Sequence, residues 1–127
     1  MNAHDGIEVV VADDESDIRL LLKLQLRQYG ISVVGEATDG LEAISVCEAT
    51  APHVVILDLL MPNMNGFEAI PELRERCPDV KIIAYSAVAG DFVRDEMAKH
   101  DIPLRLKNGD VEPLVSAIRA VVSENSH

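Results

Sequence analysis

The sequence alternates short aliphatic runs with longer segments in which apolar residues recur at helical spacing. The aliphatic runs have the length of buried strands and cover residues 7–12, 32–37, 54–58, 81–86 and 104–107. A helical pattern follows each run, and this repeated unit predicts a parallel sheet with right-handed crossovers. We therefore predict an α/β fold, a doubly wound five-stranded parallel sheet with five helices on both faces.

The helical segments show apolar faces of their own. Apolar positions begin the first three patterns at Ile18, Leu21 and Leu22, at Leu41 and Ile44, and at Ile70 and Leu73. A fourth helix is predicted at about residues 91–100. The last helix has its apolar residues on one face, at Val111, Leu114, Val115, Ile118 and Val122.

Three helix starts carry local capping signals. Asp39 with Glu42, and Asn65 with Glu68, have the spacing of capping boxes, although Asp and Asn replace Ser or Thr. Asp110 is expected to cap the last helix.

Length and composition support a single folded unit. A chain of 127 residues with 48% hydrophobic residues is long enough for one domain with a core, so we predict one domain over residues 1–127. Residues 123–127 form a polar tail that we expect to be flexible. Aromatic residues make up only 3%, so the core must be aliphatic. Cys47 and Cys77 lack metal-ligand spacing and are expected to be reduced thiols.

The formal charge of −11 limits the partners that the chain can bind. Such a charge disfavours direct nucleic-acid binding and anionic membranes, whereas a basic partner or a bound cation is favoured. The first residues lack the features of a secretion signal, and no apolar run approaches the ~20 residues of a membrane span. We therefore expect a cytoplasmic protein without membrane insertion; its oligomeric state is not predicted.

Polar residues stand where the predicted strands end. Asp13 and Asp14 follow the first strand, Asp58 ends the third, Ser86 ends the fourth and Lys107 ends the fifth. In a parallel sheet these positions meet at one edge, where ligands bind. Three carboxylates gathered there repel each other unless a cation intervenes, and Mg²⁺ prefers such oxygen ligands. The set suits phosphoryl transfer with a carboxylate nucleophile.

Together these motifs resemble the CheY-like receiver domains of two-component response regulators. They are "ADDESD" (12–17), "LDLLMPNMNG" (57–66), "YSA" (85–87) and Lys107, and the resemblance covers essentially the whole chain. It implies a flavodoxin-like sheet with strand order 2-1-3-4-5. It also implies signalling through phosphorylation-dependent contacts with a downstream protein.

The resemblance assigns a role to each site residue. Asp58 would accept a phosphoryl group from a histidine kinase or a histidine phosphotransfer protein. Mg²⁺ would be bound by Asp13, by Asp14, by Asp58 and by the backbone carbonyl of Leu60. Ser86 and Lys107 would contact the phosphoryl oxygens. A domain of this kind catalyses its own phosphorylation and dephosphorylation and has no separate enzymatic output.

The chain departs from the family pattern near its fifth strand. Asn108 follows the lysine where the family usually has a proline, and Leu104 replaces the usual aromatic residue. Tyr85 is a candidate substitute for that aromatic residue. The departures keep open an alternative function, a degenerate receiver that binds proteins without being phosphorylated.

Two unrelated functions fit the sequence less well. A nucleotide or flavin carrier needs an anion-binding loop after the first strand, but "DDESD" would repel a phosphate. A hydrolase with an aspartate nucleophile usually has a second Asp two residues later, where this chain has Leu60.

Overall fold

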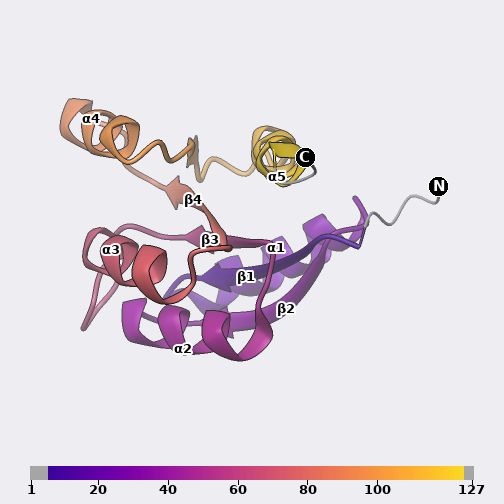
Figure 1. Ribbon diagram of the computed structural model, residues 1–127. Coiled ribbons are helices and arrows are strands. Elements are labelled where there is room, and N and C mark those ends of the chain that lie inside the picture. Colours follow the sequence, from indigo (N-terminus) through magenta and orange to yellow (C-terminus); the bar gives the residue numbers. More distant parts are fainter. Residues whose placement is uncertain (1–5, 125–127) are drawn as a thin grey trace.

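Five parallel strands form one sheet in the order β2-β1-β3-β4-β5, as predicted (Figure 1). The structure is a computed structural model that describes residues 6–124. The strands are β1 (Glu8–Ala12), β2 (Ser32–Ala37), β3 (Val54–Leu57), β4 (Lys81–Ser86) and β5 (Leu104–Leu106). The aliphatic runs thus mark the strands to within one residue at each end.

A helix follows each strand. The helices are α1 (Ser16–Arg27), α2 (Gly40–Thr50), α3 (Gly66–Arg76), α4 (Asp91–Lys99) and α5 (Glu112–Glu124). The predicted α/β class and strand order are therefore confirmed. Ser123 and Glu124, the first two residues of the predicted tail, belong to α5, and residues 125–127 lie outside the described residues.

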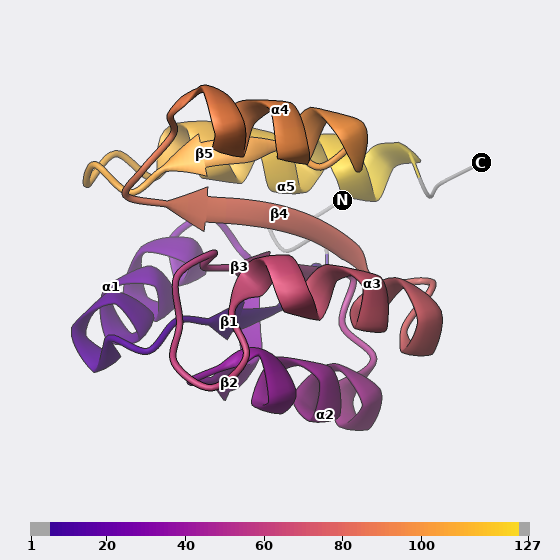
Figure 2. The same cartoon turned by 90° about the vertical axis from the view of Figure 1, so that its left-hand side faces the viewer.

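Aliphatic side chains bury both faces of the sheet. Alternate residues of a strand point to opposite faces, so Val55 and Leu57 pack with α2, α3 and α4, whereas Val54 and Ile56 pack with α1 and α5. Figure 2 shows α2, α3 and α4 nearer the viewer than α5. Each face of the sheet therefore packs against helices through one apolar cluster. The polar residues of the predicted site stand at one edge of this sheet.

Two residues of the predicted apolar faces lie in solvent instead. Leu21 of α1 and Leu41 of α2 are exposed, while Leu22 and Ile44 beside them are buried. Helical spacing identifies an apolar stripe, but the contact with the sheet decides which edge of that stripe is covered.

The helix starts follow the predicted capping signals with one change. Asn65 and Glu68 form a complete capping box. Asp39 accepts a hydrogen bond from the Glu42 N–H at 2.8 Å, but Glu42 accepts from the Thr38 N–H rather than from Asp39. Among the other signals, Asp110 accepts from the Glu112 N–H at the start of α5.

Candidate functional site

The sheet brings the predicted polar residues to its carboxyl edge. The Asp58 N–H donates to the carbonyl of Ala12 at 2.9 Å, so the residues that follow β1 and β3 lie side by side. The Lys107 N–H donates to the carbonyl of Ser86 at 2.9 Å and joins the ends of β4 and β5. Residues at the ends of β1, β3, β4 and β5 therefore meet at the carboxyl edge of the sheet.

Three carboxylates form a compact acidic cluster. Asp13, Asp14 and Asp58 each place one oxygen atom within 4.8 Å of the others. Asp13 and Asp58 are buried, whereas Asp14 is exposed at the mouth of the cluster. Hard oxygen ligands with one solvent-facing member are the donors that Mg²⁺ or another hard divalent cation prefers.

Lys107 lies within this cluster. Its Nζ atom is 2.7 Å from Asp13 Oδ2 and 3.1 Å from Asp58 Oδ2, and its side chain is only 9% exposed. Glu15 is more distant, with Oε1 at 4.0 Å from the same nitrogen. The lysine is thus a buried cation shared by two buried carboxylates.

The charges of the cluster shift two pKa values. Burial raises the pKa of Asp58, and Asp13 adds to the rise, while the Leu60 N–H and Lys107 oppose it. Burial alone would lower the pKa of Lys107, but the hydrogen bond to Asp13 and the charge of Asp58 outweigh it and raise this pKa. Asp58 is therefore a carboxylate whose charge the fold only partly compensates, and an added cation would lower its pKa.

Ser86, the last residue of β4, and Leu60, in the loop after β3, lie at the same edge. Ser86 is fully buried, and its Oγ accepts a hydrogen bond from the Val88 N–H at 3.2 Å. The Leu60 N–H donates to Asp58 Oδ1 at 3.2 Å and holds the carboxylate against the loop, while the Leu60 side chain is exposed. Leu60 thus contacts Asp58 through its amide, and the use of its carbonyl by a metal stays a prediction.

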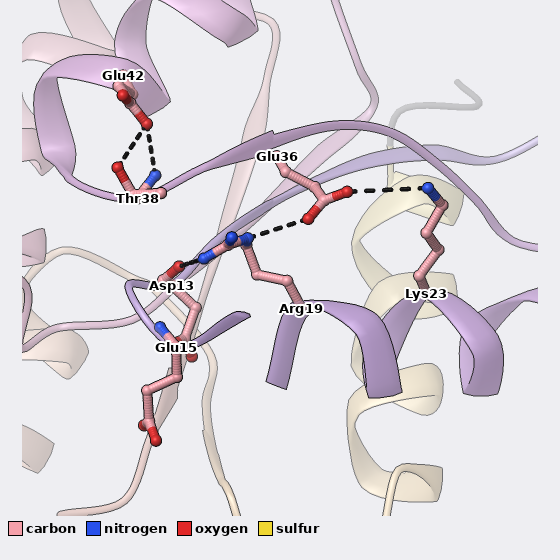
Figure 3. Close-up of polar contacts among 7 residues, drawn as sticks. All are labelled: Asp13, Glu15, Arg19, Lys23, Glu36, Thr38 and Glu42. Carbon is pink, nitrogen blue, oxygen red and sulfur yellow. Dashed lines mark hydrogen bonds and ion pairs between the residues drawn. The ribbon is translucent and has the colours of Figure 1, made fainter. Parts of the chain in front are cut away.

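The structure adds residues that the sequence did not indicate. Arg19 donates from Nη1 to the carbonyl of Asp13 at 2.7 Å and from Nε to Glu36 at 3.0 Å, and so ties the end of β1 to α1 and β2 (Figure 3). Asn63 donates to Asp39 Oδ2 at 2.9 Å and connects the loop after β3 to the start of α2. The contacts of Arg19 with Glu36 and of Asn63 with Asp39 join segments distant in sequence, so local spacing carried no signal for them.

Gly66 is required by close packing. A Cβ atom at this position would lie 2.5 Å from the carbonyl oxygen of Asp58 and 2.8 Å from Leu59 Cα. The left-handed residue of the loop is Asn63, with φ 63°. Gly66 begins α3, and its missing side chain lets the helix approach the loop.

Tyr85 does not occupy the same place as the aromatic residue missing at position 104, and its part in coupling stays a prediction. Leu104 pairs with Ala84, and Tyr85 pairs with Arg105. Leu104 packs toward α2, α3 and α4, while Tyr85 is buried with α1 and α5. The two side chains therefore lie on opposite faces of the sheet.

Comparison with known families supports the interpretation of this edge. The family model for the response regulator receiver domain matches residues 9–119. The chain belongs to the response regulator receiver domain family. The match includes the acidic pair, Asp58, Ser86 and Lys107, so the residues gathered by this receiver domain fall within the region that defines the family.

Curated relatives extend the similarity. The receiver is 40% identical over 83 residues to the chemotaxis protein CheY of Thermotoga maritima, which covers 65% of this chain and 69% of that protein. It is 34% identical over 117 residues to the transcriptional regulatory protein PdtaR of Mycobacterium tuberculosis, covering 91% of this chain. The match to PdtaR spans 56% of that protein. A separate match, to the transcriptional regulatory protein YhcZ of Bacillus subtilis, spans 38% of that protein.

Solved receiver structures share the fold. The response regulator domain of Thermotoga maritima CheB superimposes with a TM-score of 0.83 at 28% identity, over 92% of this chain and 96% of that one. A LuxR-family DNA-binding response regulator from Staphylococcus aureus has the same TM-score at 26% identity, over 91% of this chain and 98% of that one.

Within residues 6–124, every helix falls short of the length and apolarity that crossing a bilayer requires.

Proposed function

We propose that this receiver accepts a phosphoryl group on Asp58 from a phosphohistidine of a histidine kinase or phosphotransfer protein. A carboxylate oxygen of Asp58 attacks phosphorus, an O–P bond forms, and the P–N bond breaks with its electron pair going to the imidazole. The product is an aspartyl phosphate. The observation that carries the proposal is that Asp58 lies beside the other two carboxylates and the ammonium of Lys107.

Lys107 and Ser86 are proposed to stabilise the transferred group. The Lys107 ammonium lies 3.1 Å from Asp58 Oδ2, so it is near the site where the charge of the phosphoryl oxygens would develop. Ser86 ends the neighbouring strand and can donate its hydroxyl proton, because its oxygen is the acceptor in the hydrogen bond from the Val88 N–H. Phosphoryl transfer needs mainly positioning and charge neutralisation, which these two groups supply.

Mg²⁺ is the proposed cofactor. Asp13, Asp14 and Asp58 would hold it, with the carbonyl of Leu60 as a further ligand. The donor set fits, because the three carboxylates approach one another within 4.8 Å and carry more negative charge than Lys107 compensates. When bound, the ion supplies positive charge against the negative oxygens of donor and acceptor.

The proposed output is a change in protein contacts. A phosphoryl group adds about −1.5 to −2 charge to a buried site and biases any two conformations that differ there. RcsB of Salmonella enterica serovar Typhimurium, a 27% identical structural relative, was solved with the phosphomimetic BeF₃⁻. We propose that this domain likewise responds to BeF₃⁻ and passes the change to a downstream protein.

Incubation with acetyl phosphate tests the proposal. The wild-type protein with Mg²⁺ should gain the mass of one phosphoryl group, and Asp58→Asn should gain none. The gain should disappear with EDTA and in Asp14→Asn, while Asp79→Asn, an exposed acid in the turn after α3, should behave as wild type. An unmodified wild-type protein would favour the phosphorylation-independent binding module instead.

A further inference from the structure

The outer face of α1 has two adjacent stripes of unlike chemistry. Leu20 and Leu24 are four residues apart and are 57% and 50% exposed, although both are apolar. Lys23 and Arg27 form a basic stripe beside them at the same spacing, whereas Arg19, one turn earlier, points to the Asp13 carbonyl and Glu36. Residues four apart lie on one side of a helix, so each stripe is continuous.

The leucine stripe borders a groove between α1 and the edge strand β2. The groove has a volume of about 460 Å³. Its walls include side chains from α1 and from the start of β2, namely Leu20, Lys23, Leu24, Arg27, Ile31 and Val33. The four α1 residues span two helical turns, ~10 Å along the axis. A groove of this length and apolar floor fits one face of an amphipathic helix.

The charge of the groove is opposite to that of the protein. The full chain carries −11, whereas α1 has three basic residues and one acidic residue, Asp17. Glu36 of β2 pairs with Arg19 at 3.0 Å and with Lys23 at 3.8 Å (Figure 3). Arg27 forms no ion pair with any of residues 6–124. The groove is therefore lined by two bases, Lys23 and Arg27, and of these Glu36 pairs with Lys23 alone.

We propose that this groove binds an amphipathic helix of a partner protein whose apolar residues are flanked by carboxylates. Leucine-sized side chains at positions i, i+3 or i+4, and i+7 of the partner would cover Leu20 and Leu24. Its Asp or Glu residues would pair with Lys23 and Arg27. Burial of the two leucines supplies the affinity, and the charges select an acidic partner over a basic one.

This binding site is separate from the acidic cluster. Ser32 and Val33 pair with Glu8 and Val9, so the groove lies at the amino end of β1. Asp13 follows the opposite end of that strand. A helix in the groove would leave Asp58 open to a phosphodonor, and the inference does not depend on phosphorylation of Asp58.

Peptide selection tests the inference without knowledge of the partner. A displayed library of random peptides of about 16 residues is selected on the wild-type protein, after removal of peptides that bind the Leu20→Ser, Leu24→Ser double variant. Affinities of the enriched peptides are then measured for the wild type, the double variant, Lys23→Glu with Arg27→Glu, and Leu41→Ser. Leu41 is an equally exposed leucine on α2 and serves as the matched control.

The expected peptides are helical and acidic, with apolar residues at the spacing above. Their affinity should fall about tenfold or more in the serine and charge-reversed variants, remain unchanged in Leu41→Ser, and weaken with salt. Absence of enriched peptides, or selection of basic or uncharged ones, would overturn the proposal. A wild-type dimer seen by sedimentation and abolished by Leu20→Ser with Leu24→Ser would also overturn it, because the groove would then belong to a second copy.

Discussion

The ammonium of Lys107 lies 2.7 Å from Asp13 Oδ2, nearer than the 3.1 Å that separates it from Asp58 Oδ2. Asp13 therefore holds the lysine beside Asp58, the proposed acceptor. Since Asp13 is also a proposed metal ligand, one carboxylate would position both the lysine and the metal.

Replacing Lys107 with methionine should slow phosphorylation. The change keeps a long side chain but removes the charge that would face the phosphoryl oxygens, so the initial rate with acetyl phosphate and Mg²⁺ should fall ~100-fold. Intact-mass spectrometry over time provides the measurement. Lys99→Met, which removes an exposed lysine of α4, is the control. A rate equal to that of the wild type would remove Lys107 from the proposed mechanism.

Asp58→Asn should stabilise the protein at neutral pH when no divalent cation is present. The folded-state pKa of Asp58 is raised mainly by burial, so its charged form costs free energy in the folded protein. The wild type is therefore relatively most stable below the ordinary pKa of 3.8 and loses stability as pH rises through the raised value.

Urea unfolding of the two proteins in EDTA, at several pH values between about 5 and 8, measures the difference in their free energies of unfolding. The free energy of unfolding of Asp58→Asn should exceed that of the wild type by ~1 kcal/mol at the upper end. The gap should narrow toward acid pH. A gap that stays constant with pH would show that the charge of Asp58 is not its cause.

Gly66→Ala should distort the loop that follows β3 and contains Asp58. Its Cβ atom would meet backbone atoms of Asp58 and Leu59, which cannot rotate away as a side chain would. We expect a loss of ~2 kcal/mol in unfolding free energy and slower phosphorylation. Gly90→Ala offers a matched comparison, because a Cβ there meets nothing within 4 Å. Its cost should stay below ~1 kcal/mol, and equal effects of the two changes would argue against the close approach.

The caps of α2 and α3 should respond differently to pH. Hydrogen bonds from the Glu42 N–H and from Asn63 lower the pKa of Asp39, so its stabilisation is present above 3.8 and is lost as pH falls through the folded-state value. Asp39→Ala should cost ~1 kcal/mol near neutral pH and less in acid. Asn65→Ala removes an uncharged cap, so thermal unfolding should show a cost independent of pH. Parallel pH dependence of the two variants would contradict this assignment.

The sheet could be predicted because its strands are buried on both faces. Val54 to Leu57 are all buried, and a run of four aliphatic residues is typical of a strand that is covered on both faces. Strand ends then place Asp13, Asp58 and Lys107 at one edge by topology alone. The sequence thus contained the location of the site.

Details set by packing could not be predicted in the same way. Leu21 and Leu41 fit the helical pattern, yet the orientation of each helix leaves them exposed. Arg19 contacts the carbonyl of Asp13, and Asn63 contacts Asp39, through distances that depend on how α1 and α2 pack. The preference of Lys107 for Asp13 over Asp58 likewise depends on the fully assembled edge.

The most direct test of the account is to locate the phosphoryl group. Protein treated with acetyl phosphate and Mg²⁺ is reduced with borohydride, which converts an aspartyl phosphate to homoserine, and its peptides are sequenced by mass spectrometry. We predict homoserine at position 58 and unmodified aspartate at positions 13 and 14. Homoserine at position 13 or 14, or at none of the three, would contradict the central claim that Asp58 is the acceptor.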